Sequence, residues 1–182
     1  MSLIRGFIYI FFSLILGSAC TKQEDPGETE KSTTTDGIYD LPKTGDDLIG
    51  TTDVEFMRFN IQDGVAAGGA DTVAYFTQSK YVPGETTIRY EWKGATFLFS
   101  TEDNRDAFSE EPEKYAPQYG GYCAYAMSRG NMAGIDPQAF SIVDKKLYLN
   151  LSLSVRTSWG SNQEEYINKA NDFWLDVMNQ YN

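Results

Sequence analysis

The stretch TTIRYEWKGATFLFS, residues 86–100, carries the clearest fold signal in this chain of 182 residues. Two runs of β-branched and aromatic residues flank Lys93 and Gly94, which form a two-residue turn containing glycine. Because such turns join antiparallel strands with the twist that hairpins need, the stretch predicts a β-hairpin. The stretch AFSIVDKKLYLNLS, residues 139–152, predicts a second hairpin that turns at residues 144–146.

Helix signals follow the first hairpin directly. Ser100 and Asp103 form an S-x-x-D capping box, which predicts a helix that runs through residues 104–108 and ends near Pro112. The sequence PEKYA, residues 112–116, predicts a further short helical turn before a Gly-Gly break.

The last part of the chain predicts two more helices. Residues 152–159 indicate a short one, and Ser161 with Glu164 forms a second capping box that opens the final helix. Apolar residues of the final helix recur at helical spacing, so they are expected on one face. They are Tyr166, Ile167, Ala170, Phe173, Trp174 and Val177.

The remaining segments complete a mixed pattern of strands and helices. Residues 54–61, VEFMRFNI, alternate in polarity and predict a strand. Residues 64–76 contain a Gly-rich turn that leads into a short apolar element. Because strands and helices do not alternate regularly, the pattern favours an α+β fold. We expect one small domain over residues 55–182, with antiparallel hairpins packed against short helices and an amphipathic C-terminal helix.

The N-terminus resembles a bacterial lipoprotein signal. Arg5 precedes an apolar run over residues 7–16, and small residues stand directly before Cys20. A membrane span needs roughly 20 apolar residues, so this shorter run predicts a signal peptide over residues 1–19. Cys20 is the expected lipidation site, although Leu16 lies four residues before it instead of the usual three. The alternatives are an ordinary cleaved signal and an uncleaved anchor.

Charge and composition restrict the partners of the protein. Residues 20–54 are rich in Thr, Gly, Asp and Glu and predict an acidic flexible tether. Acyl chains on Cys20 would hold the protein on a membrane outside the cytoplasm, in the bacterial cell envelope. The formal net charge is −11, without a basic cluster, so no nucleic-acid partner is expected and the lipid alone should contact the membrane.

The chain contains no histidine. This absence removes Ser-His-Asp and Cys-His catalysis, HExxH zinc sites and His-ligated haem or copper. The reactive side chain that remains is Cys123, in QYGGYCAYAMSRGNM, residues 118–132. If Cys20 is acylated, Cys123 has no disulfide partner within the chain.

Three roles are open for Cys123. If the Gly-Gly pair before it opens a helix, the helix dipole favours a thiolate there, and Cys123 would be a catalytic redox residue. Met127 and Met132 follow, so the three sulfurs would suit a soft metal such as Cu(I). Cys and Met are also commonly buried against aromatic rings, so a pocket-lining thiol is the third role. The aromatic residues expected to line that pocket are Tyr119, Tyr122 and Tyr125.

Several segments together carry a family likeness. The segment GATFLFSTEDNRDAFSEEPEKYAPQYGGYCAY spans residues 94–125, GADTVAYF spans residues 69–76, SIVDKKLYLNLS spans residues 141–152, and Trp174 follows late in the chain. Over residues 64–174 the chain resembles the YHS domain-containing proteins, in particular the exported branch labelled YHS domain-containing (seleno)protein.

The resemblance has divided implications. Short YHS domains resemble the treble-clef metal-binding group and carry cysteines at places that match Val73-Ala74 and Phe99-Ser100 in this chain. Because cysteine is absent from both places, metal binding does not carry over by position. The exported branch instead keeps a cysteine that matches Cys123. Its label implies selenocysteine in some relatives, and a selenocysteine at that place would favour a redox role.

Three functions follow as hypotheses. The first is a membrane-anchored binding module for a small ligand or a metal. The second is a thiol-based redox protein or sensor that acts through Cys123 and takes any resolving thiol from a partner. The third is a non-catalytic interaction domain of the envelope in which Cys123 is inert.

Overall fold

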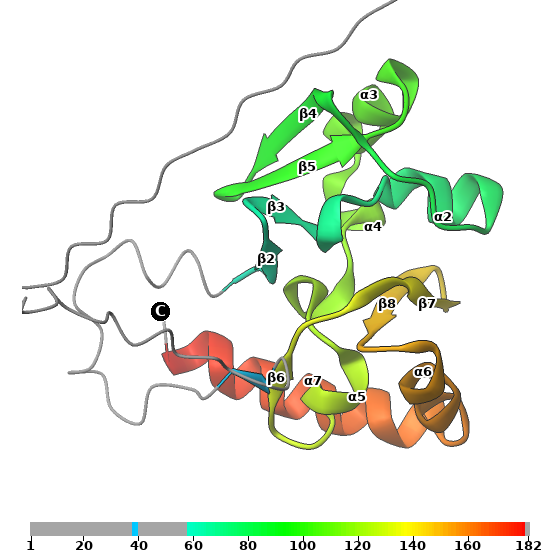
Figure 1. The fold of residues 1–182 in the computed structure, drawn as a ribbon. Coiled ribbons are helices and arrows are strands. Elements are labelled where there is room, and N and C mark those ends of the chain that lie inside the picture. Colours follow the sequence, from blue (N-terminus) through cyan, green and yellow to red (C-terminus); the bar gives the residue numbers. More distant parts are fainter. Residues whose placement is uncertain (1–37, 40–57, 181–182) are drawn as a thin grey trace, which may run out of the picture. The chain divides into compact units, whose positions relative to one another are not determined.

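The computed structural model describes residues 38–39 and 58–180 (Figure 1). The signal peptide predicted over residues 1–19 and nearly all of the tether predicted over residues 20–54 lie outside these ranges. Within them, no helix has both the length and the apolarity that a membrane span requires. The strands are β1 (Ile38–Tyr39), β2 (Ile61–Gln62), β3 (Val65–Ala66), β4 (Glu85–Trp92), β5 (Ala95–Phe99), β6 (Met132–Ala133), β7 (Asp136–Val143) and β8 (Lys146–Asn150). The helices are η2 (Ala67–Gly69), α2 (Thr72–Gln78), α3 (Glu102–Glu110), α4 (Pro112–Tyr115), η3 (Gln118–Gly121), α5 (Ala124–Met127), α6 (Leu153–Gly160) and α7 (Gln163–Gln180).

The described strands form antiparallel two-stranded ladders, and the predicted α+β class is confirmed. The β4–β5 hairpin has its predicted place and turn. Lys93 and Gly94 have positive φ angles of 48° and 78°, as a type I′ turn requires. Trp92 pairs with Ala95 across the turn. The turn residues and the runs that flank them were therefore sufficient to predict this element.

The first part of the core lies where α3 covers the hairpin. The Phe108 ring of α3 lies 4.7 Å from that of Phe97 and 5.1 Å from that of Phe99, measured between ring centroids. Phe59 meets Phe97 edge to face at 5.7 Å. All four rings are buried, so aromatic packing holds the helix on the strands.

A buried carboxylate joins three of these elements. Asp71 caps α2, because its Oδ1 accepts hydrogen bonds from the backbone N–H groups of Val73 and Ala74 at 3.1 and 3.2 Å. Its Oδ2 accepts from the backbone and hydroxyl of Ser100 at 2.9 and 2.5 Å. Asn104 Nδ2 donates to the same oxygen at 2.7 Å. Asp71 thereby ties α2 to the end of β5 and to α3.

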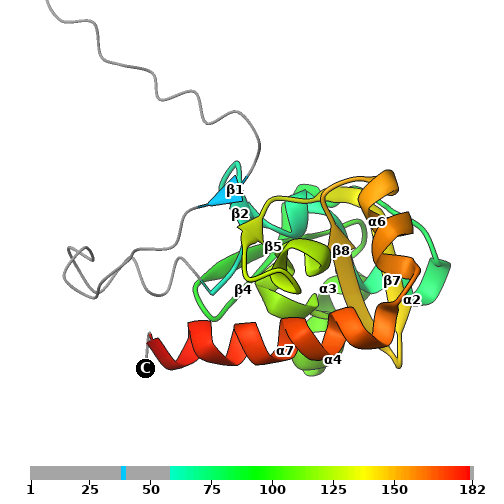
Figure 2. The ribbon, with the colours of Figure 1, turned by 90° about the horizontal axis from the view of Figure 1, so that it is seen from below.

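The β7–β8 hairpin and the helices α5, α6 and α7 form the other part of the described structure (Figures 1 and 2). Asp144 and Lys145 have φ angles of 48° and 61°, so this hairpin also turns in the predicted place. The rings of Tyr148 in β8 and Trp159 in α6 lie 5.3 Å apart. The predicted apolar face of α7 packs on the same cluster, with Ala170 and Val177 buried and Tyr166, Ile167, Phe173 and Trp174 half-buried.

The strand predicted over residues 54–61 is wrong in its described part, because β2 begins only at Ile61 and the residues before it turn. The backbone N–H of Asn60 donates to the carbonyl of Gly120 at 2.9 Å. Its side-chain amide donates to the carbonyl of Gly121 at 3.2 Å. The segment thus bonds to a distant loop instead of to a neighbouring strand.

Both predicted capping boxes are displaced. Helix α3 is capped by Thr101, whose hydroxyl oxygen accepts a backbone N–H three residues later at 3.2 Å. Ser100 cannot serve as the cap because its hydroxyl is bound to Asp71. Ser161, two residues before α7, donates its hydroxyl to the carbonyl of Ser158 at 2.7 Å. In both cases a neighbouring contact competes for the serine hydroxyl.

Candidate functional site

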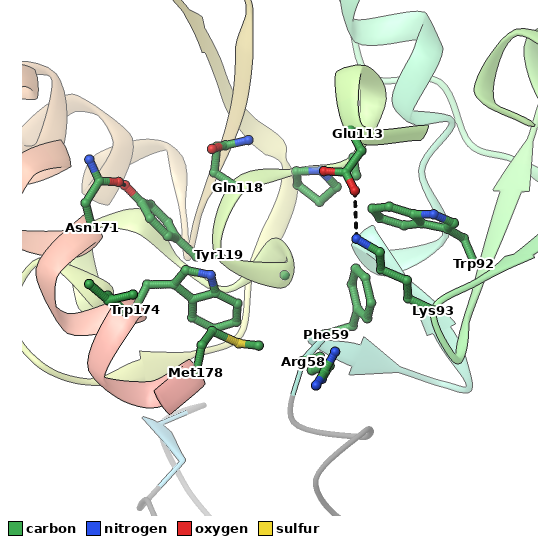
Figure 3. A pocket seen from close by; sticks show the side chains of 14 residues that line it. Arg58, Phe59, Trp92, Lys93, Glu113, Gln118, Tyr119, Asn171, Trp174 and Met178 are labelled. Carbon is green, nitrogen blue, oxygen red and sulfur yellow. Dashed lines mark hydrogen bonds and ion pairs between the residues drawn. The ribbon is translucent and has the colours of Figure 1, made fainter. Parts of the chain in front are cut away.

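A cavity of about 590 Å³ opens between the β4–β5 turn, the loop over residues 116–120 and the C-terminal half of α7 (Figure 3). Aromatic rings line each side. Phe59 and Trp92 stand on the hairpin side, Tyr119 comes from the loop and Trp174 from α7. The volume falls within the range of roughly 300–1,000 Å³ that is typical of small-molecule sites.

The hairpin side places a lysine over an indole ring. Phe59 and Trp92 meet edge to face, with ring centroids 5.7 Å apart. Lys93 Nζ lies 4.4 Å from the centre of the Trp92 ring and 2.7 Å from Glu113 Oε1. The ammonium group is therefore held by the ring face and by a carboxylate from α4 together.

The helix side is fixed by a tyrosine. The rings of Tyr119 and Trp174 lie 6.3 Å apart, and the Tyr119 hydroxyl donates to Asn171 Oδ1 at 3.0 Å. It also lies 3.3 Å from the carbonyl oxygen of Ile167. Burial raises the pKa of Tyr119 above its ordinary value, and the nearby Tyr148 adds to the rise. The phenol therefore stays a neutral donor that joins the loop to α7.

The loop between the two sides needs glycine at Gly120. Its φ angle is +60°, and a Cβ atom there would lie 1.9 Å from the carbonyl oxygen of Arg58. Tyr119, directly before it, has a φ angle of +56°, which is uncommon for a bulky residue. The close approach at Gly120 brings Arg58 and Phe59 to the cavity.

Charged groups at the cavity differ in sign from the chain as a whole. The charged side chains that line it are Arg58, Lys93 and Glu113. Two positive charges and one negative charge give a formal charge of +1, whereas the chain carries −11. The formal charge of the lining side chains thus differs in sign from that of the whole chain.

Cys123 is not among the residues that line this cavity. Its side chain is only 1% exposed and packs with Leu147 and Leu149. The thiol lies 3.8 Å from Asn150 Oδ1, and its sulfur accepts the backbone N–H of Ala126 at 3.5 Å. Burial raises the pKa of Cys123, and backbone N–H donors offset this only in part. The predicted redox role stays a prediction that this setting does not favour.

The two other predicted sulfur ligands belong to a different apolar cluster. Met127 and Met132 are fully buried with Tyr148 and Trp159, whereas Cys123 belongs to a cluster formed by other residues. No group of three or more His, Cys, Asp or Glu residues that could hold a metal occurs within residues 38–39 and 58–180. The described residues therefore show no such cluster, and the Cu(I) site of Cys123, Met127 and Met132 stays a prediction.

The three predicted pocket tyrosines have different surroundings. Tyr119 lines the cavity. The Tyr122 hydroxyl donates to the carbonyl of Phe59 at 3.3 Å and so supports the hairpin side from behind. The Tyr125 ring meets Tyr166 edge to face at 5.1 Å on α7. The cavity thus includes one of the three tyrosines directly.

From the sequence alone, the main cavity residues were predicted to have structural roles and not to bind a ligand. It placed Trp92 and Lys93 in a hairpin and Trp174 on the packing face of a helix. One local signal could have pointed to the cavity. Trp92 and Lys93 stand together at an exposed turn, and the turn itself needs neither side chain.

The places where the family resemblance implies metal-binding cysteines come together in space. Val73 and Ala74 meet Ser100 at the carboxylate of Asp71. Its two oxygens already accept five hydrogen bonds, so this carboxylate holds backbone and side-chain donors instead of a metal.

Comparison with protein families finds a YHS domain at residues 73–119. No curated protein and no solved structure matches the chain. The matched range contains Trp92, Lys93, Glu113 and Tyr119, so it supplies most of the hairpin side and the loop of the cavity. Helix α7, which closes the other side, lies beyond it. The exported branch and the lipid anchor stay predictions.

Proposed function

We propose that this protein is a binding module of the bacterial cell envelope that holds a small organic molecule in the cavity between the β4–β5 hairpin and α7. The observation that carries the proposal is the cavity itself, with a volume of about 590 Å³ and four aromatic rings in its lining. Concave, mostly apolar sites of this size are the usual places for small ligands.

The arrangement of the rings supports binding of a flat ligand. Trp92 and Trp174 lie on opposite sides of the cavity and come from different elements (Figure 3). Each indole offers apolar surface to a bound ring system, and aromatic side chains supply large contact areas at small cost in conformational entropy.

Polar groups at the rim would orient such a ligand. Gln118 and Asn171 bring amides to the lining, and Lys93 with Glu113 brings a pair of opposite charges. A few polar groups in an apolar cavity are what fixes the orientation of a bound molecule.

The predicted N-terminal features complete the proposal. A lipid on Cys20 would fix the protein to a membrane, and the acidic segment over residues 20–54 would extend the module away from its surface. The YHS domain also makes metal binding a candidate. Because the described residues hold an aromatic cavity and no cluster of three or more His, Cys, Asp or Glu residues, we favour the organic ligand.

A fluorescence titration tests the proposed site. The probe is N-phenyl-1-naphthylamine, a neutral aromatic amine, added to the full chain with Cys20→Ser so that no lipid competes. We expect Trp92→Ala and Trp174→Ala each to weaken binding by about tenfold, because each removes one aromatic wall. Leu153→Ala is the matched control, since Leu153 is 51% exposed on α6 and does not line the cavity.

Circular dichroism of each variant checks that the fold is retained. The probe should also raise the melting temperature of the parent protein, because binding to the folded state stabilises it. Equal binding by the parent, both tryptophan variants and the Leu153 variant would show that the cavity is not the site.

A further inference from the structure

We infer that the ligand is an aromatic organic anion, a flat ring system with one carboxylate or sulfonate group that reaches the Lys93 ammonium. This inference rests on the proposed function and names the ligand class for the same cavity. It follows from the charged side chains at the cavity and from the Lys93 ammonium group, which already lies over the face of the Trp92 ring.

The apolar part of the ligand is set by the walls. Phe59, Trp92 and Trp174 offer rings on both sides, and Met178 adds a flexible thioether from α7. Such walls favour a planar, unsaturated body, because they supply large aromatic faces for it to contact.

The charge of the ligand is set by the rim. Arg58 and Lys93 bring two positive charges, and Glu113 brings one negative charge. The rest of this acidic chain repels anions, so an anion would bind where a cation such as Lys93 stands beside the aromatic walls.

Lys93 is available for a ligand although it has a partner. The side chains of Lys93 and Glu113 are 50% and 77% exposed, and exposed ion pairs are weak. The ammonium group can therefore exchange Glu113 for a ligand anion at little cost. Glu113 in turn opposes the anion, both by repulsion and by competing for the lysine.

A cationic ligand fits poorly for a specific reason. An aromatic-lined cavity can bind cations through ring faces, but Lys93 Nζ already lies 4.4 Å from the centre of the Trp92 ring. A second cation at this face would meet a like charge.

Two probes with the same ring skeleton separate charge from shape. N-phenyl-1-naphthylamine is neutral, and 1-anilinonaphthalene-8-sulfonate adds one sulfonate to it. At low ionic strength we expect the sulfonate probe to bind the Cys20→Ser chain more tightly than the neutral probe. Added salt should reduce this difference, since it screens exposed charges.

Two substitutions at the rim predict opposite effects. Lys93→Met should lower the affinity for the sulfonate probe about three- to fivefold, and Glu113→Gln should raise that affinity by a similar factor. Neither substitution should change the affinity for the neutral probe by more than about twofold. Lys145→Met is the matched control, because Lys145 is an exposed lysine in the type I′ turn of β7–β8 and does not line the cavity.

The outcomes distinguish this inference from the proposed function. Equal affinity for both probes, with both still sensitive to Trp174→Ala, would overturn the inference that the ligand is an anion. It would leave the proposed binding site in place. Weaker sulfonate binding in Glu113→Gln would also overturn it. If neither probe responds to Trp174→Ala, both the inference and the proposed function fail.

Discussion

The Cys123 thiol lies among apolar side chains, and backbone N–H groups point to it, among them that of Ala126 in the first turn of α5. The helix dipole and the N–H groups favour a thiolate, and burial disfavours it. Burial is the larger effect here, so the pKa of Cys123 is raised. α5 has only four residues, so its dipole is small.

Alkylation measures this balance directly. In the Cys20→Ser chain Cys123 is the only cysteine, and we expect iodoacetamide at about pH 8 to modify it on the order of a hundredfold more slowly than in urea. Mass spectrometry over time gives both rates. Similar rates in the native and unfolded chains would instead support the redox role of Cys123.

At the scale of elements, the loop from residue 116 to residue 121 connects the two hairpin regions and forms one side of the cavity (Figure 1). Its course depends on one close contact, because the backbone of Gly120 meets that of Arg58 and the Asn60 N–H donates to the Gly120 carbonyl. A side chain at Gly120 would have to displace main-chain atoms.

Two glycine substitutions test this contact. Gly120→Ala should lower the free energy of unfolding by roughly 2–4 kcal/mol, because its Cβ would meet the Arg58 carbonyl and its φ angle is positive. Gly160→Ala is the control at the end of α6, where the added Cβ atom would meet no neighbouring side chain or segment within 4 Å. It should be neutral or stabilising by up to about 1 kcal/mol. Urea unfolding measures both. Equal stability of the two variants would refute the role of the Gly120 contact.

At the scale of the whole molecule, the described core holds several ionisable groups in neutral form. Tyr75 is 1% exposed, and its hydroxyl donates to the Pro137 carbonyl at 2.7 Å. Burial is the main cause that raises the pKa values of Tyr75, Tyr119 and Tyr148, and burial also raises that of Cys123. Each of these groups keeps its proton in the folded state at a pH where the unfolded chain has lost it.

The protein should therefore lose stability in alkali. Below about pH 8.5 these groups are protonated in both states, and above it the unfolded chain releases protons first. The free energy of unfolding should then fall as the pH rises toward about 11, at up to about 1.4 kcal/mol per pH unit for each group. Urea unfolding across this range measures the slope.

Tyr119→Phe is the informative control for the alkaline slope. It removes one buried phenol, so its stability should fall less steeply above about pH 10. A stability that stays level or rises up to about pH 11 would contradict burial as the cause.

Local patterns in the sequence determined much of this fold. The β4–β5 hairpin follows from a two-residue turn between β-branched and aromatic runs, and the β7–β8 hairpin follows from the turn predicted at residues 144–146. Helix α7 follows from apolar residues at helical spacing. These features depend on a few neighbouring residues, so they were predictable. The absence of histidine likewise excludes whole classes of chemistry through composition alone.

The tertiary structure alone decided which residues meet. Asn60 bonds to a loop 61 residues away instead of extending a strand, and Asp71 binds Ser100 so that Thr101 caps α3. The candidate site moved from Cys123 to a cavity whose walls come from four separate segments, at residues 58–59, 92–93, 113–120 and 171–178. Only Tyr119 was predicted there, because burial and close approach depend on distant parts of the chain, and no local pattern records them.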